Sequence, residues 1–311
     1  MATTGWLGVV GGLLASAVLL LSASFAAGLH GVLVARAAGA PVGRGAWMPV
    51  LEAARLLRQR RRSTLAADVV LWRIGSAGLV VVPLGMIAVV PLGSVALFDS
   101  SVGLVWFNAA DVMVWALAWL LGWGANSAWS LVGGYRFLAG AIAYELPLMF
   151  ALTAPGLAAA SLRLSDVVSA QQQVWFVVWM PVAFVVVCLG VAGFSVWGPL
   201  SPAAATDLAG GVLAELSGPD RLLAQAGRYL LLAAGAAVVT TLFLGGGNGP
   251  LLPGWAWVLV KTWAVLAGLV WLRRRLPLLR PDRFLELGWL VLLPATLLQL
   301  LVVALVVLGG R

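Results

Sequence analysis

Residues 36–62 read RAAGAPVGRGAWMPVLEAARLLRQRRR and hold seven arginines. A second basic stretch, LRRRLPLLRPDR at 272–283, holds five more. These clusters lie in alternate gaps between about eight apolar blocks of roughly 20 residues, the length that crosses the hydrocarbon core of a bilayer. Because cytoplasmic loops of membrane proteins retain Lys and Arg, the pattern predicts a polytopic membrane protein and its orientation.

The composition agrees with a membrane protein. The chain is 62% hydrophobic and 10% charged, with a mean hydropathy of +1.05, whereas a soluble domain carries about 25% charged residues. The net charge of +8 could indicate a nucleic-acid-binding protein. However, the arginines flank apolar blocks and do not form a soluble basic face. We therefore expect contact with the lipid bilayer and no nucleic-acid partner.

The apolar blocks are expected to be helices, because backbone groups in lipid must be satisfied within the chain and the period-2 alternation of a barrel is absent. The expected fold is all-α, and 1–311 is expected to form a single membrane domain of the cell (plasma, or inner) membrane. With the arginine-rich gaps in the cytoplasm, both termini lie on the other side. The first block is long enough to span and is not expected to be a cleaved signal. The expected spans are 6–28, 69–93, 102–121, 133–160, 174–194, 225–246, 255–272 and 285–308.

The first basic gap also carries a helical pattern. Apolar residues between Val50 and Leu57 alternate at helical spacing with Glu52 and arginines, and Pro49 stands where the first turn of a helix is expected. An amphipathic helix of this kind lies in the headgroup plane with its arginines toward phosphates or a partner. The alternative is a solvated basic loop that only sets the topology.

Among the ionisable residues inside apolar blocks, where charge is costly and usually functional, four stand out: Asp111, Arg136, Glu145 and Glu286. Arg136 and Glu145 share one block, but their separation of nine positions places them on different sides of a helix. Pro147 follows Glu145 closely, and a proline frees a backbone carbonyl that can open a helix to water or to a partner. A carboxylate there suits a proton relay; the alternative is a carboxylate satisfied by a neighbouring helix.

Several classes of site are excluded by the residues present. Cys188 is the only cysteine and lies in an apolar block, so no disulfide framework or thiolate metal cluster can form. His30 is the only histidine, which excludes a histidine-based metal site, a Ser-His-Asp triad and paired haem ligands. The stretch GGGNGP at 245–250 lacks the Lys and Ser/Thr of a phosphate loop and is expected to be a turn. We detect no internal repeat of the kind found in inverted-repeat transporters.

Three stretches close together, GWGANS at 122–127, GGYR at 133–136 and YELP at 144–147, resemble the third-to-fourth helix region of the H subunit of proton-pumping NADH-quinone oxidoreductase, or complex I. Its mitochondrial counterpart is NADH dehydrogenase subunit 1. The order and spacing of the similar segments extend over most of the chain, and eight helices with both termini outside is the family's core topology. Further similar segments are 164–168, 241–246, 261–262, 273–277, 280–283, 287–289 and 293–294.

The resemblance implies a role. In this family the subunit docks the soluble quinone-reducing arm, forms part of the quinone chamber and begins a series of buried carboxylates linked to proton translocation. It holds no redox centre, so this chain is expected to bind no cofactor or metal and to be inactive alone, with quinone as a substrate of the whole complex. The expected partners are the soluble arm and antiporter-like membrane subunits. Residues 48–57 resemble the amphipathic segment beside the quinone entrance.

The candidate site residues follow from the buried positions and from the resemblance together. The proton-path candidates are Glu145, Asp207, Glu215 and Asp111, of which Asp207 and Glu215 match acids near the end of the family's fifth-to-sixth helix loop. The candidates for the quinone chamber and for docking are Arg36, Arg44, Glu52, Arg55, Arg136, Arg280, Asp282 and Arg283.

One segment departs from the family. Residues 194–205 read FSVWGPLSPAAA where the family carries a Glu-x-Asn-Arg-x-Pro-Phe-Asp signature, so only the proline, as Pro199, corresponds. The basic stretch after the first apolar block is also reduced, and both losses fall on the quinone chamber and the start of the proton path. Two other functions compete: the membrane anchor of a nickel-iron hydrogenase or related ferredoxin-linked complex, and a stand-alone transporter or structural membrane protein. The GWGANS and LGW stretches favour the complex I subunit.

Overall fold

The computed structural model describes residues 2–93, 96–206 and 210–309, with side chains from residue 11 onward. Eight helices of this part are long and apolar enough to span a membrane, which confirms the predicted all-α polytopic fold. The elements are α1 (Ala2–Ala37), α2 (Val42–Arg58), α3 (Val69–Ala88), α4 (Gly103–Gly124), α5 (Ala128–Ala159), α6 (Leu164–Ser169), α7 (Phe176–Trp179), α8 (Pro181–Phe194), the 3-10 helix η1 (Gly198–Ala204), α9 (Gly218–Phe243), α10 (Gly254–Arg275), α11 (Pro281–Leu287), the π-helical turn η2 (Gly288–Leu292) and α12 (Leu293–Gly309).

Some boundaries of the spans differ from the predicted ones. The first span continues to Ala37 instead of ending at 28, and the fourth begins at Ala128 instead of 133. The fifth begins at Pro181 and not at 174, because a proline fits the first turn of a helix but cannot continue the preceding one, α7. The sixth likewise begins at Gly218, with a proline in its first turn.

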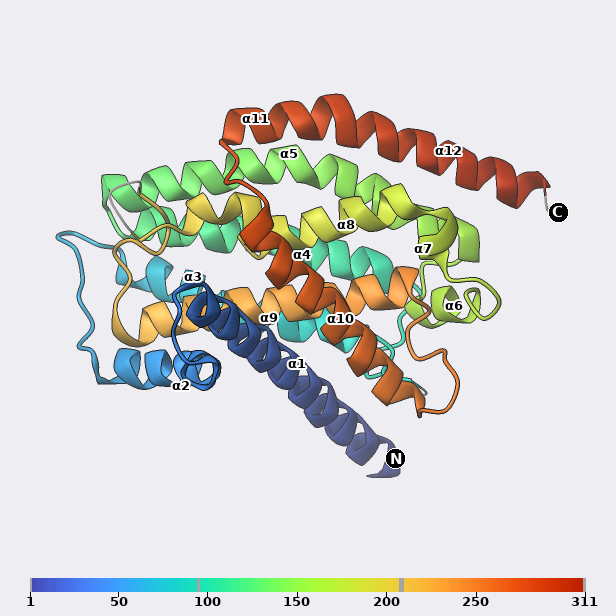
Figure 1. Cartoon of the computed structure of the whole chain (residues 1–311), viewed down its shortest axis with the longest axis horizontal. Coiled ribbons are helices and arrows are strands. Elements are labelled where there is room, and N and C mark those ends of the chain that lie inside the picture. Colours follow the sequence, from blue (N-terminus) through green and yellow to red (C-terminus); the bar gives the residue numbers. More distant parts are fainter. Residues whose placement is uncertain (1, 94–95, 207–209, 310–311) are drawn as a thin grey trace.

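Helix α9 is the centre of the bundle and contacts α1, α2, α3, α8 and α10. Every residue from Leu230 to Phe243 is buried, as expected for a helix that is apolar on all sides. Helices α4, α5, α8, α9 and α12 run along the long axis, whereas α1 and α10 cross it obliquely (Figure 1). The sequence at the end of α8 continues as a buried segment: Ser195–Pro199 is enclosed by protein although it is not α-helical.

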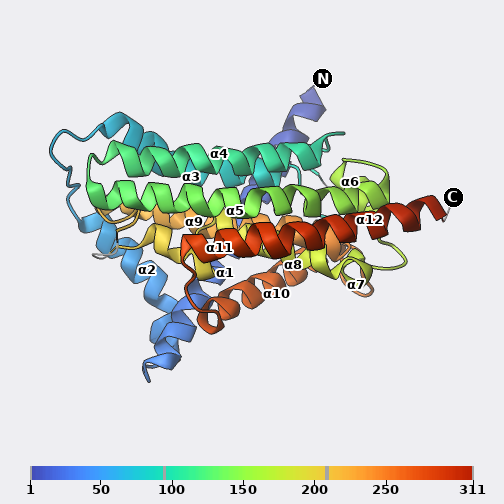
Figure 2. The same cartoon turned by 90° about the horizontal axis from the view of Figure 1, so that it is seen from above.

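The two ends of the bundle carry different elements of the chain. The N- and C-termini lie toward the end that carries α6 and α7, and α2 lies toward the other end (Figures 1 and 2). An even number of spans returns the chain to the side where it began, so both termini share a side, as predicted. The arginine-rich segments 36–62 and 273–283 both belong to the α2 end.

Helix α2 forms as predicted, but its start was predicted wrongly. It begins at Val42, directly after Pro41, so Pro49 lies inside the helix and not in its first turn. The helix crosses α1 where Gly31 faces Gly45, and a methyl group on either glycine would overlap the backbone of the other. This close crossing holds the N-terminal half of α2 against α1 and explains why the helix extends ahead of the proline. Its apolar side chains Trp47 and Leu51 remain exposed.

Candidate functional site

Two carboxyl groups meet inside the bundle. Asp111 of α4 is fully buried and Glu145 of α5 is 9% exposed. Asp111 lies about 12 Å along α4 from Gly103, near the middle of that 22-residue helix. The two carboxyl groups lie close enough for each to act electrostatically on the other. The sequence had indicated the two residues separately, and the structure brings them together as a pair.

The pair lies in a small polar layer between the two helices. Asn108, Asp111 and Trp115 share one face of α4 at helical spacing, and the Asn108 side chain lies near Glu145. From α5, the hydroxyl group of Tyr144 lies near Trp115 and near both carboxyl groups. The layer is surrounded by buried apolar side chains of the same core.

The pair lacks a compensating cation among the residues that the structure describes. None of the four carboxyl oxygens accepts a hydrogen bond from another described group, and no Lys or Arg is among the groups that act on either carboxyl. Two ionised carboxylates that lie side by side repel each other, and burial adds the free-energy cost of desolvating both. Two carboxyl groups can bond to each other only when one of them carries a proton.

Pro147 does not interrupt α5, which continues to Ala159. Because proline has no N–H group, the carbonyl group of Ala143, four residues earlier, receives no helical hydrogen bond. This carbonyl packs against Gly288, in the π-helical turn η2. The freed carbonyl therefore faces a partner helix, one of the two outcomes that the Glu145–Pro147 spacing predicted.

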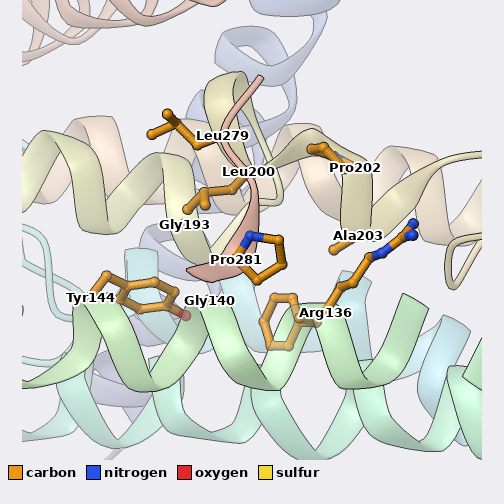
Figure 3. A pocket seen from close by; sticks show the side chains of 10 residues that line it. Arg136, Gly140, Tyr144, Gly193, Leu200, Pro202, Ala203, Leu279 and Pro281 are labelled. Atoms are coloured by element: carbon orange, nitrogen blue, oxygen red, sulfur yellow. The ribbon is translucent and has the colours of Figure 1, made fainter. Parts of the chain in front are cut away.

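A small cavity lies on the side of Tyr144 that faces the α2 end of the bundle. Its volume is about 20 Å³, enough for about one water molecule. Arg136, Gly140 and Tyr144 line it from one face of α5, with Tyr144 against Gly193 of α8 (Figure 3). The opposite wall comes from η1, from the connection between α10 and α11, and from the first residue of α11. Its residues are Leu200, Pro202, Ala203, Leu279 and Pro281.

The remaining proton-path candidates lie near the loop between α8 and α9. Arg136 donates a hydrogen bond through Nη1 to the carbonyl oxygen of Gly210, 2.8 Å away. Glu215 accepts a 2.6 Å hydrogen bond from the hydroxyl group of Ser127, the residue before α5. Asp207 lies outside the described residues. Arg136 and Glu215 thus tie this loop to the start of α5 and do not contact the carboxyl pair.

The docking candidates are mostly paired on the surface. Glu52 and Arg55 form a two-pronged ion pair on α2 with distances of 2.6 and 2.7 Å, and Arg280 lies 3.3 Å from Asp282. Arg283 lies 2.9 Å from Glu286. Arg36 and Arg44 are exposed near the start of α2.

Glu286 lies inside the last candidate span, Pro281–Gly309, as expected from the sequence, but its side chain is not buried. Its side chain is 57% exposed, because α11 begins at Pro281 and places Glu286 in an early turn at the α2 end of the bundle. Other ionisable residues inside apolar spans were missed, among them Arg228 of α9 and Lys261 of α10. The rule that flagged Asp111 and Glu145 applies to them equally and would have found them.

Comparison with known proteins agrees with the sequence resemblance. A model of the NADH dehydrogenase family matches residues 9–304. H subunit 2 of the NADH-quinone oxidoreductase of Geobacter sulfurreducens is 36% identical over 270 residues, which cover 83% of this chain and 82% of the relative. The H subunit of the Geobacillus kaustophilus enzyme is 32% identical over 268 residues, covering 84% and 80%. The eight-span bundle and these matches together show that the chain belongs to the H-subunit family of NADH-quinone oxidoreductase.

Proposed function

We propose that the chain is the membrane-arm subunit of a complex I-like oxidoreductase that passes electrons from NADH or another donor to quinone. In this role it docks the soluble arm, contributes to the quinone chamber and links that chamber to proton translocation through Asp111 and Glu145. Its partners are the soluble quinone-reducing arm and the antiporter-like membrane subunits. The chain lies in the cell membrane with the α2 end in the cytoplasm.

The observation that carries the proposal is the Asp111–Glu145 pair. Two interacting carboxyl groups without a cation are best stabilised by a single proton held between them, since this removes the repulsion and supplies a hydrogen bond. Such a pair binds one proton readily. Adding a second proton, or removing the first, costs free energy. A change in the neighbouring charge, for example on reduction of quinone, then favours uptake or release of a proton.

The cavity beside Tyr144 supports an access route from the α2 end. It begins near Arg136, at the level of the loop between α8 and α9, and ends at Tyr144, whose hydroxyl group lies near both carboxyls. A water molecule in this space together with the tyrosine hydroxyl would connect the pair to that loop. Entry from this side would place proton transfer close to the segment 195–205, where the chain departs from the family.

The experiment replaces the two acids without changing their shape. In native membranes, Asp111→Asn and Glu145→Gln should each leave the complex assembled, and each should lower proton uptake coupled to donor oxidation by about tenfold or more, within the range for a positioned proton donor or acceptor. The double variant should be no worse than the worse single variant, because the pair acts as a unit. Glu286→Gln, at an exposed acid, is the matched control and should behave like the unchanged protein.

Glu145→Ala should differ from Glu145→Gln. It opens space beside Asp111 and Asn108 at membrane depth, so it should lower the yield of the complex as well. Normal rates and normal proton stoichiometry in both Asp111→Asn and Glu145→Gln would show that the pair only fastens α4 to α5, and the proposed link to translocation would then be abandoned.

A further inference from the structure

An apolar groove with a volume of about 440 Å³ lies between α8 and α10. Its walls include Phe184 and Cys188 of α8 and Gly268 of α10. The lining extends from Phe184 to Ala192 on one helix, about 12 Å at 1.5 Å per residue. Half of a hydrocarbon core is about 15 Å, so the groove matches the depth of one leaflet.

One end of this groove is cationic. Trp197 and Arg273 line it there, and the Arg273 guanidinium stacks on the Trp197 ring with its carbon 4.4 Å from the ring centre. Nη1 of Arg273 also lies 3.5 Å from Nε2 of His30. This end lies past the last turn of α8, where α10 contacts η1.

Several positive charges converge on this end. Arg228, Arg273 and Arg274 all act on the His30 ring, and Arg228 and Arg273 repel each other. Arg228 donates to backbone carbonyls, from Nε to Ser195 at 3.3 Å and from its terminal nitrogen to Val196. Among the described residues none of these three arginines has a carboxylate partner.

The cluster also contains buried polar atoms that lack a hydrogen bond to any described group. Trp197 is 2% exposed and its Nε1 has no such partner, and the same is true of Nδ1 of His30. Partly buried cations without a counter-ion are costly, so the cluster is electrostatically incomplete as it stands. A neutral apolar molecule in the groove would not correct this deficit.

We propose that the groove between α8 and α10 binds an anionic phospholipid, with an acyl chain along the apolar walls and the phosphate at Arg273. A basic pocket between transmembrane helices at the headgroup level suits an anionic lipid headgroup. The phosphate of the lipid supplies the missing negative charge, and its acyl chain packs against the apolar walls of the groove. The proposal does not depend on the role of Asp111 and Glu145.

The test uses the chain purified together with its accompanying subunits and measures bound lipid by mass spectrometry. Phosphatidylglycerol should be retained in preference to phosphatidylcholine. Arg273→Gln should remove this preference and weaken phosphatidylglycerol binding about fivefold, equivalent to about 1 kcal/mol for one charge near anionic lipid. Its control is Arg163→Gln, which removes a surface charge at the opposite end of the bundle.

A second variant tests the apolar part of the groove. A Cβ at Gly268 would meet nothing within 4 Å, and Gly268 lines the groove. Gly268→Leu should therefore fill part of the groove and displace the lipid while leaving thermal stability unchanged. Gly309 is a helical glycine with equal space outside the groove, and Gly309→Leu should retain the lipid.

A third measurement needs no variant. Phosphatidylglycerol with a photoreactive acyl chain, in vesicles with the complex, should label 184–199 and 264–276 more strongly than the phosphatidylcholine analogue. Equal labelling by the two lipids, or full lipid retention in Gly268→Leu, would overturn the proposal. Absence of labelling in the intact complex would mean that another subunit covers the groove. Quinone that co-purifies with the unchanged protein and is lost in Gly268→Leu would mean that the groove binds quinone. Either result also rejects the lipid.

Discussion

The ammonium group of Lys261 lies 4.3 Å from the centre of the Trp175 ring, at the end of the bundle opposite α2. The same group donates hydrogen bonds to the backbone carbonyls of Leu244, Gly246 and Asn248, at 2.6, 3.0 and 2.7 Å. The only lysine of the chain thus binds the turn that follows α9 as a cation binds a ring of carbonyl oxygens. Its positive charge is compensated by carbonyl dipoles and by the face of an aromatic ring.

We therefore predict that Lys261→Met destabilises the folded chain by about 1–3 kcal/mol, since it leaves buried carbonyl groups without a donor. Lys261→Gln can still donate two hydrogen bonds and should recover part of the loss. The measurement is thermal unfolding in detergent. Equal unfolding temperatures for the unchanged protein and Lys261→Met would show that the turn is held by its other contacts.

Gly193 and Tyr144 provide a test of packing beside the carboxyl pair. A methyl group at Gly193 would overlap the ring of Tyr144, so Gly193→Ala should cost about 1–3 kcal/mol of stability, as overpacking does. It should also lower coupled proton uptake, because Tyr144 is displaced. Gly268→Ala is the control, since its methyl group meets nothing within 4 Å; it should be neutral or slightly stabilising. A Gly193→Ala variant with unchanged proton uptake would remove Tyr144 from the proposed route.

The basic cluster after α2 is predicted to help dock the soluble arm. Arg60, Arg61 and Arg62 are exposed, and only Arg61 has an acidic partner among the described residues, Asp220 at 3.3 Å. Replacing all three by Gln should lower retention of the soluble subunits, most clearly as salt is raised. Arg61→Gln alone should have little effect, as expected for a surface pair. If the triple variant retains the soluble subunits like the unchanged protein across the salt range, the cluster serves only to set topology.

The sidedness of the bundle can be measured with single cysteines in a Cys188→Ala background. An impermeant maleimide added to intact cells should label Gln172→Cys and Leu251→Cys, because both sites are exposed at the end opposite α2. Ser63→Cys and Leu278→Cys should react only after the cells are opened, since basic loops remain in the cytoplasm. Labelling of Leu278→Cys from outside would reverse the proposed orientation.

The Glu52–Arg55 pair predicts a pH effect on α2. The hydrogen bond from Arg55 holds the pKa of the Glu52 carboxyl below its ordinary range. A lowered pKa in the folded state means that the pair stabilises α2 above the ordinary value of about 4.3, and that this contribution is lost as pH falls through the lowered pKa. Carbon-13 NMR of the four glutamate carboxyls should show the pKa of Glu52 rising toward normal in Arg55→Gln. Arg58→Gln should leave it in place; an unchanged value in Arg55→Gln would reject the pair in solution.

The number of spans, the fold class and the family could all be predicted from the sequence. Span lengths are local, because the thickness of the hydrocarbon core sets how many consecutive apolar residues are needed. The sharing of one side by the two termini follows from the even number of spans, and the family followed from short motifs such as 122–127. The start of α2 could not be predicted, because the Gly31–Gly45 crossing with α1 outweighs the local preference of Pro49 for a first turn.

The sequence by itself determined which residues are ionisable at membrane depth, and so it indicated Asp111 and Glu145 separately. Only the tertiary structure decided that they face each other, that Arg136 turns to Gly210 instead, and that Arg273 stacks on Trp197 at the end of a groove. The reason is that the direction of a side chain around a helix axis depends on how that helix is rotated and tilted against its neighbours. In a membrane this rotation is set by close packing between helices, because lipid surrounds every apolar face equally well.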